Sequence, residues 1–388
     1  MKLKNTSATA FFAFAAVSAH AQSSVTLYGV LDTGFLWQTT NVATFLPSAT
    51  QNRNLGSSVS LMQGASMFGL TGSEDIGGGY EVNFRLQGAF SVTNGRSGLP
   101  GAPGASSMFT QVTSVGLQGA FGKIDFGRQY AAMAYALRDT DARTAQYFGS
   151  ILTGWVAMNT VAGWPGNNSN LAFGGLYDDN AIIYNSPSFH GVSVALEYAP
   201  GGVAGQLQGG TRESAVLKYS NYGLNAAAIY YNAHDANPYQ YPTATTAVPA
   251  TGQNNNRFVY FGAKYTWHSL SVSGSFSNGR NPANENTGAT GGASGDVNMW
   301  TGGLGYRFTP AFDVSSGIYY LKDQKHNQNQ STLYVIGANY SLSKATLIYA
   351  DIGYVSNRGA MNQELAYGAP LAPGRNTAGA MVGLRHMF

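Results

Sequence analysis

Beyond its N-terminal segment, the chain consists largely of short blocks in which apolar and polar side chains alternate, separated by turn sequences. The clearest block begins at Tyr80, where Val82 and Phe84 fall on one side of an extended chain and Glu81 and Asn83 on the other. Successive side chains of a strand point to opposite faces of its sheet, so the pattern predicts strands with one apolar and one polar face. It therefore predicts an all-β fold.

Sixteen strands are predicted, five before residue 131 and eleven after residue 177. Short turns alternate between them with longer loops rich in Gly, Asn, Thr, Ala and Pro. This pattern is typical of a transmembrane antiparallel β-barrel, which also leaves no strand edge unpaired in hydrocarbon. The predicted strands lie at residues 25–37, 66–75, 80–90, 109–120, 123–130, 179–185, 191–199, 213–220, 223–232, 257–267, 269–278, 297–308, 312–322, 331–342, 344–356 and 376–388.

The composition agrees with strands that face lipid on one side and water on the other. Charged residues make up only 10% of the chain, against about 25% in a typical soluble domain. Beyond residue 21, no apolar run approaches the roughly 18 residues of a transmembrane helix. Alternation explains both observations, because it keeps the average hydropathy of every window low. The chain has no cysteine, which excludes a disulfide framework and thiolate chemistry.

The first 21 residues have the features of an export signal. Lys2 and Lys4 form a basic start, a short apolar stretch follows, and Ala19-His20-Ala21 matches a cleavage site. We therefore expect residues 1–21 to be removed and residues 22–388 to form one barrel domain. That domain keeps 19 basic and 18 acidic residues, because the signal holds two lysines and no acid. The balance excludes the clustered basic charge of a nucleic-acid-binding protein.

The alternation stops between residues 131 and 177, a stretch too long for an ordinary connection between strands. Its aromatic residues, which include Tyr135, Trp155 and Trp164, are too frequent for a disordered linker. We interpret residues 131–177 as a loop that folds into the bore of the barrel and narrows a water-filled channel.

A soluble β-sandwich or a secreted β-solenoid would also contain alternating strands. A single strand such as residues 270–277 cannot distinguish these folds from a barrel. The export signal, the sixteenfold rhythm and the aromatic residues near strand ends favour the barrel, because membrane barrels carry aromatic girdles at both interfaces.

Four motifs resemble the general porins of Gram-negative β-proteobacteria. They are SVTLYGVLD at 24–32, GLTGSEDIGGG at 69–79, FGKIDFGRQY at 121–130 and GLRHMF at 383–388. The resemblance implies a homotrimer of 16-stranded barrels, embedded in the lipid and lipopolysaccharide of the cell outer membrane. Each barrel would be a general diffusion porin, with a passive channel for small hydrophilic solutes and ions. The third extracellular loop, which corresponds here to residues 131–177, would lie inside the pore.

The C-terminus adds a second implication of this resemblance. An alternating outward row ends in Phe388, as in the last strand of Gram-negative outer-membrane proteins. In those proteins the terminal aromatic residue is read by the barrel-assembly machinery. We therefore expect Phe388 to act as an assembly signal.

In this family, basic residues of the wall face acidic residues of the loop at the constriction. Arg128 matches the family's position for a wall arginine. Met67 and Thr71 stand where family members commonly carry basic residues. The chain therefore has less positive charge at these two positions than the family usually has.

Several charged residues lie on the polar side of their predicted strands, and we expect them to face the lumen. An Arg or Lys that faced lipid at the membrane midplane would cost about 2–4 kcal/mol. The predicted constriction comprises Arg85, Glu81, Arg128, Arg138, Asp139, Asp141 and Arg143. The predicted lumen wall includes Lys218, Lys264, Arg307, Arg385, Glu197 and Asp351.

Two interpretations of these charges remain open. Opposed charges across the bore, with Asp139 or Asp141 facing Arg128, would create a transverse field that sieves dipolar solutes. Alternatively, the wall charges are merely solvated, and a local Arg–Asp network of residues 138–143 only pins the loop.

Enzymatic functions have no support in the sequence. There is no H-E-x-x-H pair and no G-x-S-x-G elbow, and the glycines at 77–79 form a turn that no helix follows. We expect no catalytic residue, no cofactor and no metal. Two alternatives to a general porin remain: a substrate-specific porin, and an outer-membrane adhesin or enzyme with its site on the loops.

Overall fold

The computed structural model describes residues 24–41, 50–56, 66–92, 95–97, 108–161, 176–235, 252–282, 295–367, 369, 371 and 373–388. The expected signal, residues 1–21, lies outside the described residues, and so does the part of the expected pore loop from 162 to 175.

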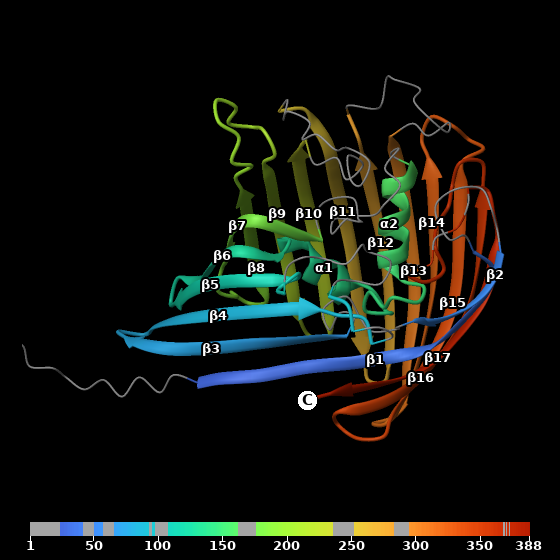
Figure 1. Ribbon diagram of the computed structural model, residues 1–388, viewed down its shortest axis with the longest axis horizontal. Helices are drawn as coiled ribbons and strands as arrows, with labels where there is room; N and C mark the ends of the chain where they lie inside the picture. The colour runs from blue at the N-terminus through green and yellow to red at the C-terminus, as the bar shows by residue number, and fades with distance from the viewer. Residues whose placement is uncertain are drawn as a thin grey trace, which may run out of the picture.

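The described strands form a single antiparallel sheet that closes on itself, because β1 pairs with β17. Figure 1 shows them curving around a central space. The strands are Ser24–Asn41 (β1), Thr50–Gly56 (β2), Met67–Gly77 (β3), Tyr80–Ala89 (β4), Val112–Gly119 (β5), Gly122–Tyr130 (β6), Tyr177–Asn185 (β7), Val192–Ala199 (β8), Arg212–Asn221 (β9), Leu224–His234 (β10), Asn254–Trp267 (β11), Leu270–Arg280 (β12), Asp296–Thr309 (β13), Phe312–Asp323 (β14), Gln330–Ser341 (β15), Thr346–Arg358 (β16) and Thr377–Met387 (β17).

Within the described ranges the sheet has 17 strands, but β2 and β3 occupy one position in the wall. Both pair with β1: β3 with its first half, and β2 with its second half. The predicted barrel of 16 strand positions is therefore confirmed. The placement of β2 is a correction, because residues 50–56 lie between the predicted strands at 25–37 and 66–75 and were therefore expected to be loop. Its sequence, TQNRNLG, has one large apolar residue and therefore lacks the alternating pattern.

The β3–β4 hairpin shows how the short turns are made. Gly77, Gly78 and Gly79 have φ angles of 87°, 65° and 80°. Three successive left-handed residues are accessible at low cost only to glycine. The turn therefore depends on the glycine run and closes β3 onto β4 in the observed register.

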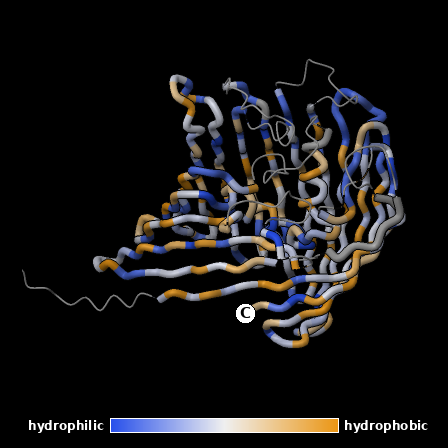
Figure 2. The backbone as a smooth tube through the Cα atoms, in the orientation of Figure 1, coloured by the Kyte–Doolittle hydropathy of each residue, from blue (hydrophilic) through white to orange (hydrophobic). Residues whose placement is uncertain are grey.

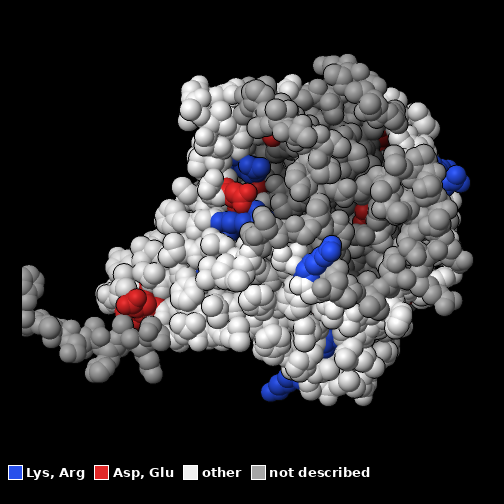
Figure 3. Space-filling model, in the orientation of Figure 1, with Lys and Arg blue, Asp and Glu red and all other residues white. Residues whose placement is uncertain are grey.

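The two faces of the wall differ in chemistry, as the alternation predicts. Large apolar side chains remain exposed on the outer face, among them Leu27 at 60% and Phe35 at 68%. The tube in Figure 2 alternates between hydrophobic and hydrophilic residues along most strands, and few charges appear on the face shown in Figure 3. On the outer face of β12, β13 and β14, the rings of Phe276, Trp300 and Tyr320 form a contiguous row with centroids 5.6 and 5.7 Å apart. This aromatic row is typical of a lipid-facing barrel surface.

Two helices form in the segment between β6 and β7, where only an irregular loop was expected. Helix α1 covers Ala132–Thr140 and contacts β8 to β12, and α2 covers Ile151–Val161 and contacts β13 and β14. Figure 1 shows both helices inside the curved wall. Among the described residues, no helix is long and apolar enough to cross a membrane.

Helix α1 has a local physical basis. Its sequence, AMAYALRDT, contains strong helix formers and no β-branched residue before Thr140. At its start, the Ala132 N–H donates a 2.9 Å hydrogen bond to Glu197 Oε2 on β8. This bond satisfies one of the N–H groups of the first helical turn that have no partner within the helix. The wall therefore both positions and stabilises the beginning of α1.

Candidate functional site

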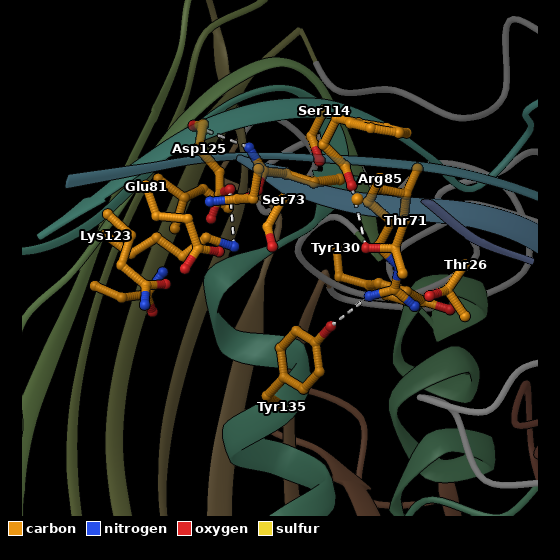
Figure 4. A pocket seen from close by; sticks show the side chains of 18 of the residues that line it. Thr26, Thr71, Ser73, Glu81, Arg85, Ser114, Lys123, Asp125, Tyr130 and Tyr135 are labelled. Atoms are coloured by element: carbon orange, nitrogen blue, oxygen red, sulfur yellow. Dashed lines mark hydrogen bonds and ion pairs between the residues drawn. The ribbon is translucent and has the colours of Figure 1, made fainter. Parts of the chain in front are cut away.

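A cavity of about 740 Å³ lies between α1 and the part of the wall made by β1 and β3 to β7, with Lys218 of β9 also in its lining. Most of the polar residues around it are uncharged, for example Thr26, Ser73 and Ser114. Figure 4 shows them around the cavity, with Tyr135 of α1 on one side and the strands on the other. The cavity is thus a polar space between the loop and the wall.

Arg85 reaches into this cavity from β4. Its Nε donates a 2.8 Å hydrogen bond to the Tyr28 hydroxyl, and its Nη2 donates to Gln87 Oε1. Its Nη1 lies 3.4 Å from the hydroxyl of Tyr135 on α1. Among the described residues, no carboxylate forms an ion pair with Arg85. Arg85 is therefore a positive charge held in place by neutral groups.

A second group of charges lines the other end of the cavity. Lys123 Nζ lies 3.0 Å from Asp125 Oδ1, and Glu81 stands nearby in the same lining (Figure 4). A Cβ atom at Gly116 would overlap Asp125 Oδ1, so glycine makes room for that carboxylate. Glu81 and Arg85 are four residues apart on β4, which corresponds to about 13 Å along a strand. Two of the predicted constriction residues therefore do line one cavity.

Asp141 follows α1 directly and is buried against the opposite wall. Its Oδ1 accepts a 2.9 Å hydrogen bond from the Tyr319 hydroxyl, and its Oδ2 accepts one of 3.1 Å from the Ala145 N–H. Lys264 Nζ donates to the Asp141 carbonyl oxygen at 3.3 Å. Burial raises the pKa of the Asp141 carboxyl above its ordinary value, and the Ala145 and Tyr319 hydrogen bonds and the nearby Arg143 oppose this rise. Asp141 therefore attaches the loop to the wall.

Arg143 is fully buried and crosses from the loop to β16. Its Nη2 lies 2.8 Å from Asp351 Oδ1, and both side chains are almost completely inaccessible to solvent. Removing one partner of a buried ion pair costs about 3–5 kcal/mol, because the remaining charge stays buried without compensation. Arg143 and Asp351 were predicted in the constriction and in the lumen wall respectively, and the structure brings them together.

Two other predicted residues pair locally. Arg138 forms an ion pair with its neighbour Asp139, and its guanidinium lies 5.5 Å from the centre of the Tyr135 ring. The Asp139 side chain is 41% exposed. The predicted local Arg–Asp network thus exists at 138 and 139, whereas Asp141 and Arg143 bind the wall instead.

Arg128 does not face the acids of the loop. Its Nη1 pairs with Asp179 of β7, its Nε donates a 2.9 Å hydrogen bond to the Thr110 carbonyl, and its guanidinium lies 5.3 Å from the centre of the Tyr177 ring. Of the two open interpretations, the opposition of Asp139 or Asp141 to Arg128 therefore has no ion pair to support it among the described residues. The physical reason is that Asp179, on the neighbouring strand, neutralises Arg128.

The remaining wall charges lie on the phase predicted for the lumen. Arg385 is buried directly across from Asp32 of β1, and Lys264 contacts the loop. Arg307, opposite Asp313, is exposed near the short β13–β14 turn. These residues therefore differ in their surroundings: Arg385 is buried, Lys264 is half-buried against the loop, and Arg307 is open to solvent.

The C-terminal residue joins the first strand. Phe388 exchanges two backbone hydrogen bonds with Gly29, of 2.9 and 3.0 Å, and its side chain is exposed. The last residue thus takes part in closing the sheet.

Several contact residues of the site were not expected from the sequence. They are mostly tyrosines: the hydroxyls of Tyr28 and Tyr135 contact Arg85, that of Tyr319 contacts Asp141, and that of Tyr260 contacts Thr140 of the loop. The alternation of side chains along a strand could have placed the strand tyrosines in the lumen, but it does not show which residue each hydroxyl would contact. Within the described ranges no group of three or more His, Asp or Glu side chains could hold a metal ion.

Comparison with known proteins adds the family context. Residues 8–360 match the family model described as "Gram-negative porin". Outer membrane porin protein 32 of Delftia acidovorans is 26% identical over 377 residues, which covers 96% of each chain.

Solved structures show the same fold. The anion-selective porin from Comamonas acidovorans aligns with a TM-score of 0.73 and 22% identity, over 94% of this chain and all of that one. The trimer form of OmpT from Vibrio cholerae aligns with a TM-score of 0.60 and 12% identity, over 94% and 99% of the two chains.

Proposed function

Because this chain belongs to the family of Gram-negative porins and forms a general porin channel of the outer membrane, we propose that solutes pass through the barrel on one side of the loop 131–177. The loop, and not the wall alone, then sets the narrowest point of a passive path for ions and small hydrophilic molecules. The family is one of channels, so an enzymatic function is not proposed.

One observation carries this proposal: α1 and α2 pack mainly against one side of the barrel. Their neighbours are β8 to β14, whereas the polar cavity lies on the other side of α1, against β1 and β3 to β7. Polar lining favours water over an apolar plug. A passage between α1 and β3 to β6 is therefore the path that the geometry supports.

The residues that we assign to the constriction are those that border this passage and keep accessible charge. Arg85 and Glu81 border it from the wall. Arg138 and Asp139 are partly exposed at the end of α1, where the Arg138 guanidinium lies over the ring of the cavity residue Tyr135. Arg128 and the buried Asp141 are assigned to holding the structure instead. Because Arg85 lacks an ion-pair partner among the described residues, we propose a weak preference for anions, the property named for the Comamonas porin.

The assembly state and processing form part of the same proposal. A trimer form has been solved for Vibrio cholerae OmpT, which supports a homotrimer here. Cleavage after Ala21 and recognition of Phe388 by the assembly machinery follow from the sequence features at the two ends. The partners in the membrane are then lipid and lipopolysaccharide.

Reconstitution into a planar bilayer tests the proposal. We expect large conductance that rises in steps of three and scales with bulk salt conductivity. Block by one class of solute, with saturating current, would identify a substrate-specific porin instead. Absence of any conductance by correctly folded trimers would contradict the proposed function.

A further inference from the structure

Arg143 makes contacts that go beyond a simple ion pair. Its five N–H groups all find acceptors: Nε donates to the Gly149 carbonyl at 2.6 Å, Nη1 to the carbonyl and hydroxyl of Ser315, and Nη2 to the Phe148 carbonyl and Asp351 Oδ1, both at 2.8 Å. Two of these acceptors belong to the loop itself, and two residues belong to the wall. The Arg143 side chain therefore connects the loop residues Phe148 and Gly149 to the barrel wall at Ser315 and Asp351.

The inner face of the wall leaves space for the Arg143 guanidinium. Ser315, Gly337 and Asp351 are direct cross-strand neighbours on β14, β15 and β16, so they form one row on the inner face. A Cβ atom at position 337 would overlap Asp351 Oδ1 and lie 2.7 Å from Arg143 Nη1. The backbone of Gly337 does not have a positive φ, so its glycine is required by the space for the side chains and not by the turn of the chain.

The chain next to Arg143 follows the same side of the barrel. The Thr140 hydroxyl lies 2.6 Å from the Tyr260 hydroxyl on β11, and the Ala142 N–H donates a 3.0 Å hydrogen bond to Ser273 Oγ on β12. On the other side of α1, the hydrogen bond between Arg85 of β4 and Tyr135 is long, at 3.4 Å. The loop is therefore attached strongly to β11–β16 and weakly across the cavity.

We infer that Arg143, Gly337 and Asp351 form a docking site that fixes the position of the loop and thereby the width of the passage. They are positioning residues, since none of them borders the cavity described above. A fully buried guanidinium cannot leave its carboxylate without leaving an uncompensated charge. The docking site thus keeps the loop in one position. This inference rests on the proposed passage between α1 and the β3–β6 wall.

The sharpest test fills the space at position 337 without changing any charge. Gly337→Ala places a methyl group where the ion pair lies, so the loop should move off the wall. We expect lower main conductance, added subconductance levels and closure at a lower voltage in planar bilayers. Gly305→Ala is the matched control: Gly305 lies on β13 near the loop residue Ala142, but the nearest atom to its new Cβ is 3.6 Å away. It should behave like the wild type.

A second variant covers the case in which Gly337→Ala fails to assemble. Asp351→Asn keeps an oxygen acceptor for Arg143 but removes the charge, and it should lower the closure voltage with normal trimer yield on unheated gels. Asp351→Ala should have a larger effect than Asp351→Asn. A merely structural role would reduce yield or heat resistance and leave the gating of surviving channels unchanged.

The outcomes separate this inference from the proposed function. Wild-type channels without conductance would overturn the proposed function itself. Conducting wild-type channels, together with Asp351→Asn and Asp351→Ala channels of unchanged conductance and closure voltage, would overturn the docking site.

Discussion

The hydroxyl of Tyr135 on α1 lies 3.4 Å from Nη1 of Arg85 on β4, where the loop and the wall approach each other across the polar cavity. Arg85 is held there by the Tyr28 hydroxyl and Gln87, so its charge stays near the narrowest part of the proposed passage. Because Arg85 has no ion-pair partner within the described ranges, this fixed cation should attract anions and repel cations.

Arg85→Gln should therefore weaken anion preference. A unit charge acts on an ion about 4 Å away with about 1 kcal/mol in water. Attraction of anions and repulsion of cations both enter the permeability ratio, so the anion-to-cation ratio should fall by a factor of about 30 or less. Reversal potentials under a salt gradient measure this ratio. Lys344→Gln, in the exposed β15–β16 turn, is the control and should have no effect. An unchanged ratio in Arg85→Gln would place the ion path elsewhere.

Asp139 and Asp141 should give different results although they are only two residues apart. Asp139 is partly exposed beside Arg138, so Asp139→Asn should shift selectivity towards anions, and the shift should shrink as salt rises. The Asp141 carboxylate is buried and accepts a hydrogen bond from the Tyr319 hydroxyl, so it holds the loop and does not face the ion path. Asp141→Asn should therefore alter current noise and channel closure more than ion selectivity. Single-channel recordings and reversal potentials of both variants distinguish these effects. The reverse assignment of the two phenotypes would contradict the structure.

The barrel could be predicted from the sequence because each strand carries its own alternating pattern. Parity also placed Asp351 and Arg385 on the inner face. The pairing of Arg143 with Asp351 could not be predicted, because 208 residues separate them and only the closed barrel brings them together. The need for glycine at 337 has the same origin, since it arises from two side chains on other elements.

Other features were missed for local reasons. Helix α1 is nine residues long, too short for a strong helical periodicity, and it is stabilised by the wall carboxylate of Glu197. Strand β2 pairs by its backbone, and its sequence lacks the apolar residues that mark the other strands. The ion pair of Arg128 with Asp179 was not predicted, because strand patterns do not indicate which charges of neighbouring strands meet.

Asp141 should also give the docked loop a specific pH dependence. Its raised pKa means that the docked loop binds a proton more tightly than a released loop would. Protonation of this group therefore favours docking at low pH, and this contribution is lost as the pH rises through the raised pKa. The measurement is the closure voltage against pH for the wild type and for Asp141→Asn. The difference between the two curves should be largest above the raised pKa and should shrink on acidification; a constant difference would show that Asp141 does not titrate in the docked loop.

Phe388 should affect assembly more than permeation. Its backbone completes the pairing of the C-terminus with Gly29, and its exposed ring lies on the outer surface, away from the cavity. Deleting it should leave the Gly29 backbone groups unpaired at the edge where the barrel closes, and such groups are costly in a membrane. We expect much lower outer-membrane levels, whereas the remaining channels should keep wild-type conductance. Phe388→Tyr should retain near-normal levels because it keeps both the backbone and an aromatic ring. Phe308→Ala, which removes another exposed aromatic ring of the outer surface, is the control for a general loss of lipid contact. Normal levels combined with altered conductance in the deletion variant would refute a role of Phe388 in assembly.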